Sequence, residues 1–174
     1  MPITGKLTVT ELRARYAAGG ADALMPYAPA ILVYPGYDGL TDVSWAYSTD
    51  SLNVKPETPA SSVEADGVPS LLPGNAVVIP LFIGDKDAAI VGRDDACDVC
   101  LSSSNVSRRH ATIVRSGKHY IILDLGSSNG TRVDGLWLKN GVTYNLGAGR
   151  SVEFADVGTI FLDMAGLVDV CRDG

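Results

Sequence analysis

The sequence predicts an all-β protein, a sandwich of two antiparallel sheets preceded by one helix and extra strands. Three observations predict this fold. Short runs of β-type residues recur from Asn75 onward, turn residues separate them, and helical periodicity is absent there. The chain of 174 residues is 46% hydrophobic, which is enough for a full core. We therefore expect one β-sandwich domain with an N-terminal appendage.

The first element is a short helix near the N-terminus. Thr8 and Glu11 have the spacing of a capping box, and Gly19-Gly20 is a stop signal. The residues between them place an apolar stripe on one helix face, formed by Val9, Leu12 and Tyr16.

Two strands are expected next, at residues 30–34 and 43–48. Asp38-Gly39 lies between them and favours a hairpin or a longer loop. The whole extension, residues 1–50, has an apolar helix face and strands that need cover. We expect it to pack on the sandwich, because burial removes that surface from water; a homodimer or partner face is the alternative.

Residues 51–74 are expected to form an exposed connector. They contain Pro56, Pro59, Pro69 and Pro73 among serine and acidic residues, with little periodic apolar surface. A spacer or surface loop is the simpler interpretation, and a tail phosphorylated at Thr58, Ser61 or Ser62 is the alternative.

Residues 75–174 form the predicted sandwich domain. Turn pairs such as Asp134-Gly135 and Asn140-Gly141 tolerate the positive φ angles of tight hairpins. The expected strands are 76–82, 88–91, 99–101, 111–115, 120–124, 131–133, 136–138, 143–146, 151–154 and 159–162.

Charge and composition exclude several classes of function. A formal net charge of −6 argues against sequence-independent nucleic-acid binding, which needs a cationic face. No stretch approaches the roughly 20 apolar residues of a membrane span, and the start lacks a signal-peptide core, so we expect a cytoplasmic protein. Cys97, Cys100 and Cys171 indicate reduced thiols; a CxxC pair without a second pair favours packing over a metal site or cofactor.

Three polar clusters lie at the ends of predicted strands. They are Gly92-Arg93, residues 107–110 (Ser-Arg-Arg-His) and residues 126–131 (Gly-Ser-Ser-Asn-Gly-Thr). If the sheet brings them to one end, guanidinium groups, hydroxyls, a carboxamide and glycine-freed N–H groups meet there. These donors suit a phosphate beside a peptide backbone.

The same residues resemble the forkhead-associated (FHA) domain family. Gly92-Arg93, Ser107-x-x-His110 and Ser128-Asn129-Gly130-Thr131, followed by Val133-Asp134-Gly135 and Leu138, are similar to the family signature in order and spacing. The resemblance covers roughly residues 77–164 and includes small bacterial proteins that join such a domain to an N-terminal extension. It implies a non-enzymatic two-sheet sandwich whose loops bind phosphothreonine peptides in signalling.

The resemblance also implies a role for each residue. Arg93, Ser107, Arg108 and Ser128 would contact the phosphate, and Asn129 would bond the peptide main chain. Gly92, His110 and Gly130 would be structural supports, the histidine bracing the loop from behind and Gly92 allowing close packing. Asn105 takes the position from which some relatives read the third residue after the phosphothreonine. The implied partner is a phosphothreonine protein, such as a serine/threonine kinase or its substrate.

Each residue alone has a simpler interpretation. Arg93 could be a solvated charge, Ser107 a turn hydroxyl and Asn129-Gly130 an ordinary hairpin turn. No sequence motif of hydrolases, nucleotide-binding loops, zinc proteases or kinases is present, so an enzyme is not expected. The alternative function is a phosphate-independent scaffolding protein that docks a partner through a sheet face.

Overall fold

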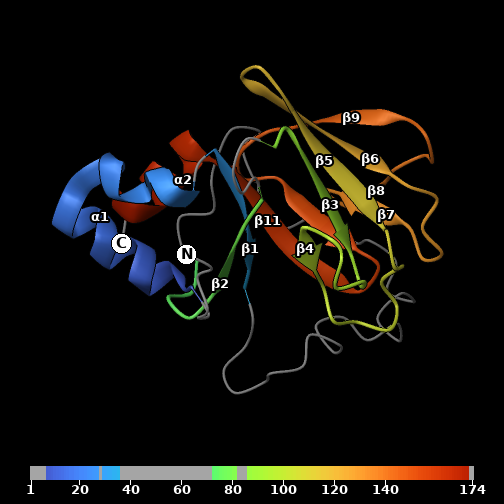
Figure 1. Cartoon of the computed structure of the whole chain (residues 1–174), viewed down its shortest axis with the longest axis horizontal. Helices are drawn as coiled ribbons and strands as arrows, with labels where there is room; N and C mark the ends of the chain where they lie inside the picture. The colour runs from blue at the N-terminus through green and yellow to red at the C-terminus, as the bar shows by residue number, and fades with distance from the viewer. Residues whose placement is uncertain (1–6, 28, 36–71, 82–85, 173–174) are drawn as a thin grey trace, which may run out of the picture.

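A computed structural model describes residues 7–27, 29–35, 72–81 and 86–172, which form two facing sheets with helices against one outer face (Figure 1). One sheet has six strands in the order β2-β1-β11-β10-β7-β8, and the other has five in the order β4-β3-β5-β6-β9. All pairs are antiparallel except β3 with β4. The strands are β1 Ala30–Tyr34, β2 Val77–Pro80, β3 Ala88–Gly92, β4 Val99–Cys100, β5 Ala111–Ser116, β6 His119–Asp124, β7 Thr131–Val133, β8 Leu136–Trp137, β9 Thr143–Leu146, β10 Ser151–Phe154 and β11 Val157–Asp163.

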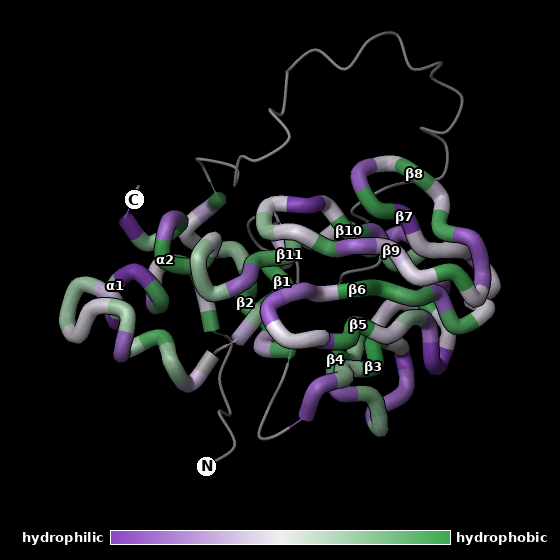
Figure 2. Tube along the Cα trace, turned by 90° about the horizontal axis from the view of Figure 1, so that it is seen from above, coloured by the Kyte–Doolittle hydropathy of each residue, from purple (hydrophilic) through white to green (hydrophobic). Residues whose placement is uncertain are grey.

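The core of the sandwich follows from the two-residue alternation of its strands. Buried residues alternate with more exposed ones along β6 and over the first four residues of β5, and the register pairs Ile113 with Ile122, both fully buried. Phe154 and Phe161 fill the same layer from the facing sheet. Burying each such side chain contributes about 1.5–3 kcal/mol. Figure 2 shows hydrophobic segments along the central strands and hydrophilic segments at many of the turns.

A second apolar cluster lies on the outer face of the six-stranded sheet. Ile31 and Val33 on β1 face this cluster, whereas Leu32 faces the sandwich core. They pack with residues of α1 (Val9–Gly19), η1 (Gly20–Tyr27) and α2 (Met164–Arg172). Because both faces of β1 are covered, its sequence is a continuous apolar run. The described part of the extension thus packs on the sandwich, and the predicted N-terminal helix is confirmed.

The boundaries of α1 have the expected chemistry. The Thr8 side chain accepts a hydrogen bond from Glu11 N (3.3 Å), and the Glu11 carboxylate accepts one from Thr8 N (2.8 Å). Gly20 adopts φ 62°, which ends the α-helix. The 3-10 helix η1 that follows was not predicted.

One expectation is wrong. Helical periodicity was expected to be absent after Asn75, but α2 forms there, and the Asp163 side chain caps it by accepting a hydrogen bond from Gly166 N (2.9 Å). Its apolar residues Leu167, Val170 and Cys171 pack in the cluster on the outer sheet face. Both edges of β1 are paired, with β2 and with β11. Residues 43–48 and most of the connector 51–74 lie outside the described residues.

No helix in the described ranges has both the length and the apolar character that crossing a membrane requires.

Candidate functional site

Three loops meet at one end of the sandwich, which we call the loop end. They are the β3–β4 loop (93–98), the β4–β5 loop (101–110) and the β6–β7 loop (125–130). The antiparallel pairing of β3, β5 and β6 places the end of β3, the start of β5 and the end of β6 side by side. The sheet therefore brings together all three polar clusters of the sequence.

The first two loops are joined through their backbones. Arg93 N donates to Ser107 O (3.0 Å), and Asp94 N donates to Arg108 O (3.2 Å). A Cβ at Gly92 would lie 2.2 Å from Arg108 O, so no side chain fits there. Gly92 thus permits the contact that aligns Arg93 with the Ser107 loop.

The second and third loops are joined through side chains. Ser107 Oγ accepts from Ser128 N (3.0 Å), so its hydroxyl hydrogen remains available to a ligand. Asn129 Nδ2 donates to Asn105 O (2.8 Å), which leaves a second N–H and the amide oxygen for a bound chain.

His110 connects the same loops from inside the molecule. The fully buried ring accepts from Ser107 N at Nδ1 (3.1 Å), so Nε2 carries the proton and donates to Gly130 O (2.9 Å). Burial lowers the pKa of His110, and its bond to Gly130 opposes this only in part. A neutral imidazole is the form that can make both bonds.

Asp124 holds the β6–β7 loop and was not predicted. Its carboxylate accepts from Gly126 N and Ser127 N (both 2.9 Å) and from the hydroxyls of Ser127 and Thr131 (both 2.6 Å). Burial alone would raise the pKa of Asp124, but these hydrogen bonds outweigh it and the pKa is lowered. The loop therefore starts from a fixed anionic anchor.

Asp156 holds the β4–β5 loop from the facing sheet and was also missed. It lies in the β10–β11 turn, is 8% exposed, and accepts from Ser103 Oγ (2.8 Å) and Asn105 Nδ2 (2.9 Å). Asn105 in turn accepts from Asn129, so a chain of bonds runs from Asp156 to a predicted contact residue. The sequence did not point to Asp156, because an aspartate in a turn usually accepts hydrogen bonds from its own turn's backbone.

The side chains of Arg93 and Arg108 are exposed at this end. Neither has a hydrogen-bond or ion-pair partner among the described residues. Arg93 is bound to Ser107 through its backbone and Arg108 follows Ser107 in the chain, so two guanidinium groups without an ion pair in the described part of the chain belong to the loops around this hydroxyl. This arrangement suits a dianionic phosphate.

All eight predicted site residues lie at the loop end. The five predicted contact residues are half-buried or exposed, His110 and Gly92 are buried, and Gly130 adopts φ 79°. The packing predicted for Cys100 is wrong, because this cysteine is exposed on β4 while Val99 faces the core.

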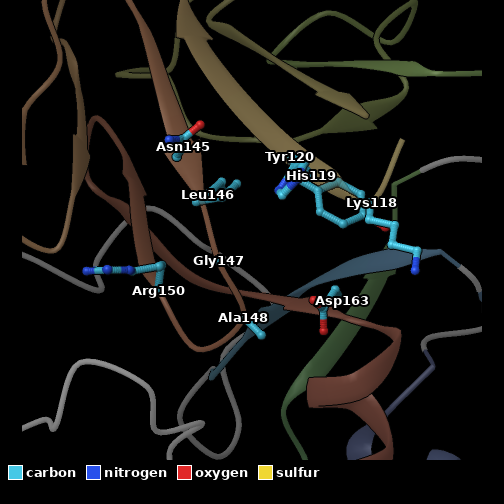
Figure 3. Close-up of a pocket in the computed structure, with 9 residues that line it drawn as sticks. All are labelled: Lys118, His119, Tyr120, Asn145, Leu146, Gly147, Ala148, Arg150 and Asp163. Carbon is cyan, nitrogen blue, oxygen red and sulfur yellow. The ribbon is translucent and has the colours of Figure 1, made fainter. Parts of the chain in front are cut away.

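A cavity of about 480 Å³ lies at the opposite end of the strands, beside the β5–β6 turn (Figure 3). Lys118, His119 and Arg150 line it. Arg150 Nη1 is bound to Asp134 Oδ2 (2.5 Å), and its side chain points away from the other labelled residues in Figure 3. None of the predicted site residues lines this cavity.

Comparison with known proteins finds similarity to one family. Residues 89–155 match the model of the FHA domain. The transcriptional regulatory protein EmbR of Mycobacterium tuberculosis is 47% identical over 60 residues, which cover 34% of this chain and 16% of EmbR. The glycogen accumulation regulator GarA of Mycolicibacterium smegmatis is 29% identical over 130 residues, covering 66% of this chain and 82% of GarA.

A solved structure of Mycobacterium tuberculosis EmbR in complex with a low-affinity phosphopeptide is similar at a TM-score of 0.45 and 34% identity, covering 52% of this chain and 22% of that one. The sequence match spans about a sixth of the length of EmbR. The match to the FHA domain model over residues 89–155, the loop-end residues and the two-sheet fold agree, so this part of the chain is similar to a forkhead-associated domain.

Proposed function

We propose that this protein binds phosphothreonine-containing protein segments at the loop end and acts as a signalling adaptor. One observation carries the proposal. Backbone and side-chain hydrogen bonds link the three loops around Ser107, and the exposed arginines on two of them have no partner among the described residues.

Each contact residue has a group free for the ligand. Arg93 and Arg108 offer guanidinium N–H groups, and Ser107 offers its hydroxyl hydrogen to the phosphate. Ser128, adjacent on the third loop, offers its hydroxyl from the other side. Asn129, held by Asn105, presents its remaining amide atoms to the peptide main chain.

The class of partner follows from this chemistry. A phosphate near pH 7 carries a charge of about −1.5 to −2. Two guanidinium groups therefore favour a phosphorylated threonine over one with an unmodified hydroxyl. A serine/threonine kinase or one of its substrates would present such a group.

EmbR and GarA are named as regulators, which supports a regulatory role for this protein. FHA domains are binding modules, and we propose that this chain has no catalytic activity of its own.

The domain division and the location of the protein remain proposals. We propose that residues 75–174 carry the binding domain, residues 1–50 an extension that contributes β1 to its sheet, and residues 51–74 a connector. A cytoplasmic location is supported by the three cysteines, which are free thiols.

Calorimetric titration with a phosphothreonine peptide library tests the function. We expect the phosphorylated peptides alone to bind, and Arg93→Ala to abolish binding, because each charge-assisted hydrogen bond contributes about 1.5–3 kcal/mol. Arg150→Ala is the matched control, since this arginine lies at the opposite end and is paired with Asp134. Equal binding of phosphorylated and unmodified peptides would instead favour phosphate-independent docking through a sheet face.

A further inference from the structure

Two large apolar side chains are exposed beside the β6–β7 loop. Leu136 is 73% exposed and Trp137 is 59% exposed, and both lie on β8, the outermost strand of the six-stranded sheet. A single exposed leucine is ordinary, but an exposed tryptophan is typical of the centre of a binding surface. Leu136 pairs with Val133 and Trp137 pairs with Arg132, so the two side chains lie on opposite faces of the sheet. We call the exposed Trp137 side chain the β8 patch.

The tryptophan ring is held in place within the chain. The guanidinium carbon of Arg132 lies 4.8 Å from the centre of the Trp137 ring, and Arg132 also pairs with Glu153. The register aligns Trp137 with Arg132 and Arg132 with Glu153, so the three residues form one row across β8, β7 and β10. A ring that is already oriented loses little conformational entropy when a partner binds.

The β8 patch is continuous with the loop end. A Cβ at Gly130 would lie 2.5 Å from Trp137 Cζ3, so the ring packs directly against that glycine. Gly130 follows Asn129, the residue predicted to bond the peptide main chain, and Gly130 O accepts from His110. A polypeptide held by Asn129 therefore has the Trp137 ring as an immediate neighbour.

We infer that the β8 patch is a second contact for the same phosphoprotein and receives an apolar side chain from the residues that flank its phosphothreonine. This inference rests on the proposed function. A second copy of the chain is a poorer occupant, because a stable interface buries roughly 1,200–2,000 Å², far more than one exposed side chain on a two-residue strand provides. A small patch is sufficient once the phosphate contacts have localised the partner.

Titration with peptides of two lengths tests the inference. The probes are a short phosphothreonine core peptide selected from the library, and the same core extended on either side by about six residues, which span roughly 20 Å when extended. One set of extensions contains leucine and phenylalanine, and the other contains only serine and glycine. We expect one apolar extension to tighten binding to the wild-type protein by about 10-fold or more, and Trp137→Ala to remove this gain while leaving core affinity within about 2-fold.

Two further variants keep the result interpretable. Met25→Ala removes an apolar side chain that is 60% exposed on η1, outside the loop end, and should retain the full gain. Trp45→Phe leaves Trp137 as the only tryptophan, and its fluorescence should shift with the apolar extension and not with the polar one.

The possible results separate the two proposals. A core peptide that does not bind overturns the proposed function and this inference with it. A core peptide that binds, together with equal gains in Trp137→Ala and wild type, overturns only this inference. A dimer in sedimentation that Trp137→Ala dissociates would assign the patch to a second copy and also overturn it.

Discussion

Arginine and histidine occur at both ends of the sandwich, but in different surroundings. At the loop end Arg93 is unpaired among the described residues, and His110 is buried between two loops. At the opposite end Arg150 is bound to Asp134, and His119 is exposed at the start of β6, next to the β5–β6 turn. Similar residue types thus leave an arginine without an ion pair within the described ranges and bury a histidine at one end, and make an ordinary polar surface at the other.

Aspartate and glycine show the same contrast. Asp156 connects two sheets at the loop end, whereas Asp134 binds the adjacent Ser151 N (2.9 Å) within its own sheet. Gly92 lies against the Arg108 backbone, whereas Gly147 has open space around it. The difference teaches that hydrogen bonds between loops, rather than residue type, distinguish the loop end from the opposite end.

The largest difference between the two ends is expected when a glycine at each end is replaced with alanine. Gly92→Ala should lower the free energy of unfolding by about 1–3 kcal/mol or more, because its Cβ would overlap Arg108 O and force the two loops apart. Phosphopeptide affinity should be lost with it. Gly147→Ala should change stability by less than about 0.5 kcal/mol. Urea unfolding and calorimetric titration measure both, and similar effects at the two glycines would contradict the account.

A smaller effect is expected from the two aspartates. Asp156→Asn should weaken phosphopeptide binding by about 1 kcal/mol, because it loosens Asn105 and through it Asn129. Asp134→Asn, which removes the same charge at the other end, should leave affinity unchanged.

A double variant identifies the route of this effect. If Asp156 acts through Asn129, adding Asp156→Asn to Asn129→Ala should cause little further loss of affinity. Additive losses in the titrations would show that Asp156 affects binding by another route.

Local patterns in the sequence were sufficient to predict most strands and the grouping of the three clusters. The alternation in β5 and β6 and the capping box of α1 depend on neighbours a few residues apart, and both appear in the structure. The FHA resemblance then supplied the residues of the loop end, and the sheet brings them together.

What the sequence could not reveal depends on long-range contacts. β1 lies between β2 and β11 because it has two apolar faces, and its own residues do not specify these partners. The stripe of Leu167, Val170 and Cys171 on α2 is too short to distinguish a helix from a strand without the sheet that it covers. Asp156 binds Ser103 and Asn105 across more than fifty residues, so no local motif identifies it.

The smallest effect is expected from the two histidines and depends on pH. Burial lowers the pKa of His110 in the folded protein from 6.5. As the pH falls, His110 therefore gains its proton in the unfolded chain before it does so in the folded protein. The neutral ring's contribution to stability is therefore fully present above about pH 6.5 and is lost as the pH falls through the lower folded pKa, by about 1.4 kcal/mol per unit of pKa difference. Asp124, whose pKa is lowered from 3.8, loses its contribution only in a more acidic range.

Urea unfolding between roughly pH 7.5 and 5.5 isolates the histidine contribution. Replacing His110 with Gln should lower stability at pH 7.5, because the bonds to Ser107 and Gly130 are lost or weakened, and should flatten the dependence on pH. His119→Gln should keep the wild-type slope, since that side chain is exposed at the opposite end. A slope that persists in His110→Gln would mean that another group titrates in this range, and the loop end would then not be held by a neutral histidine.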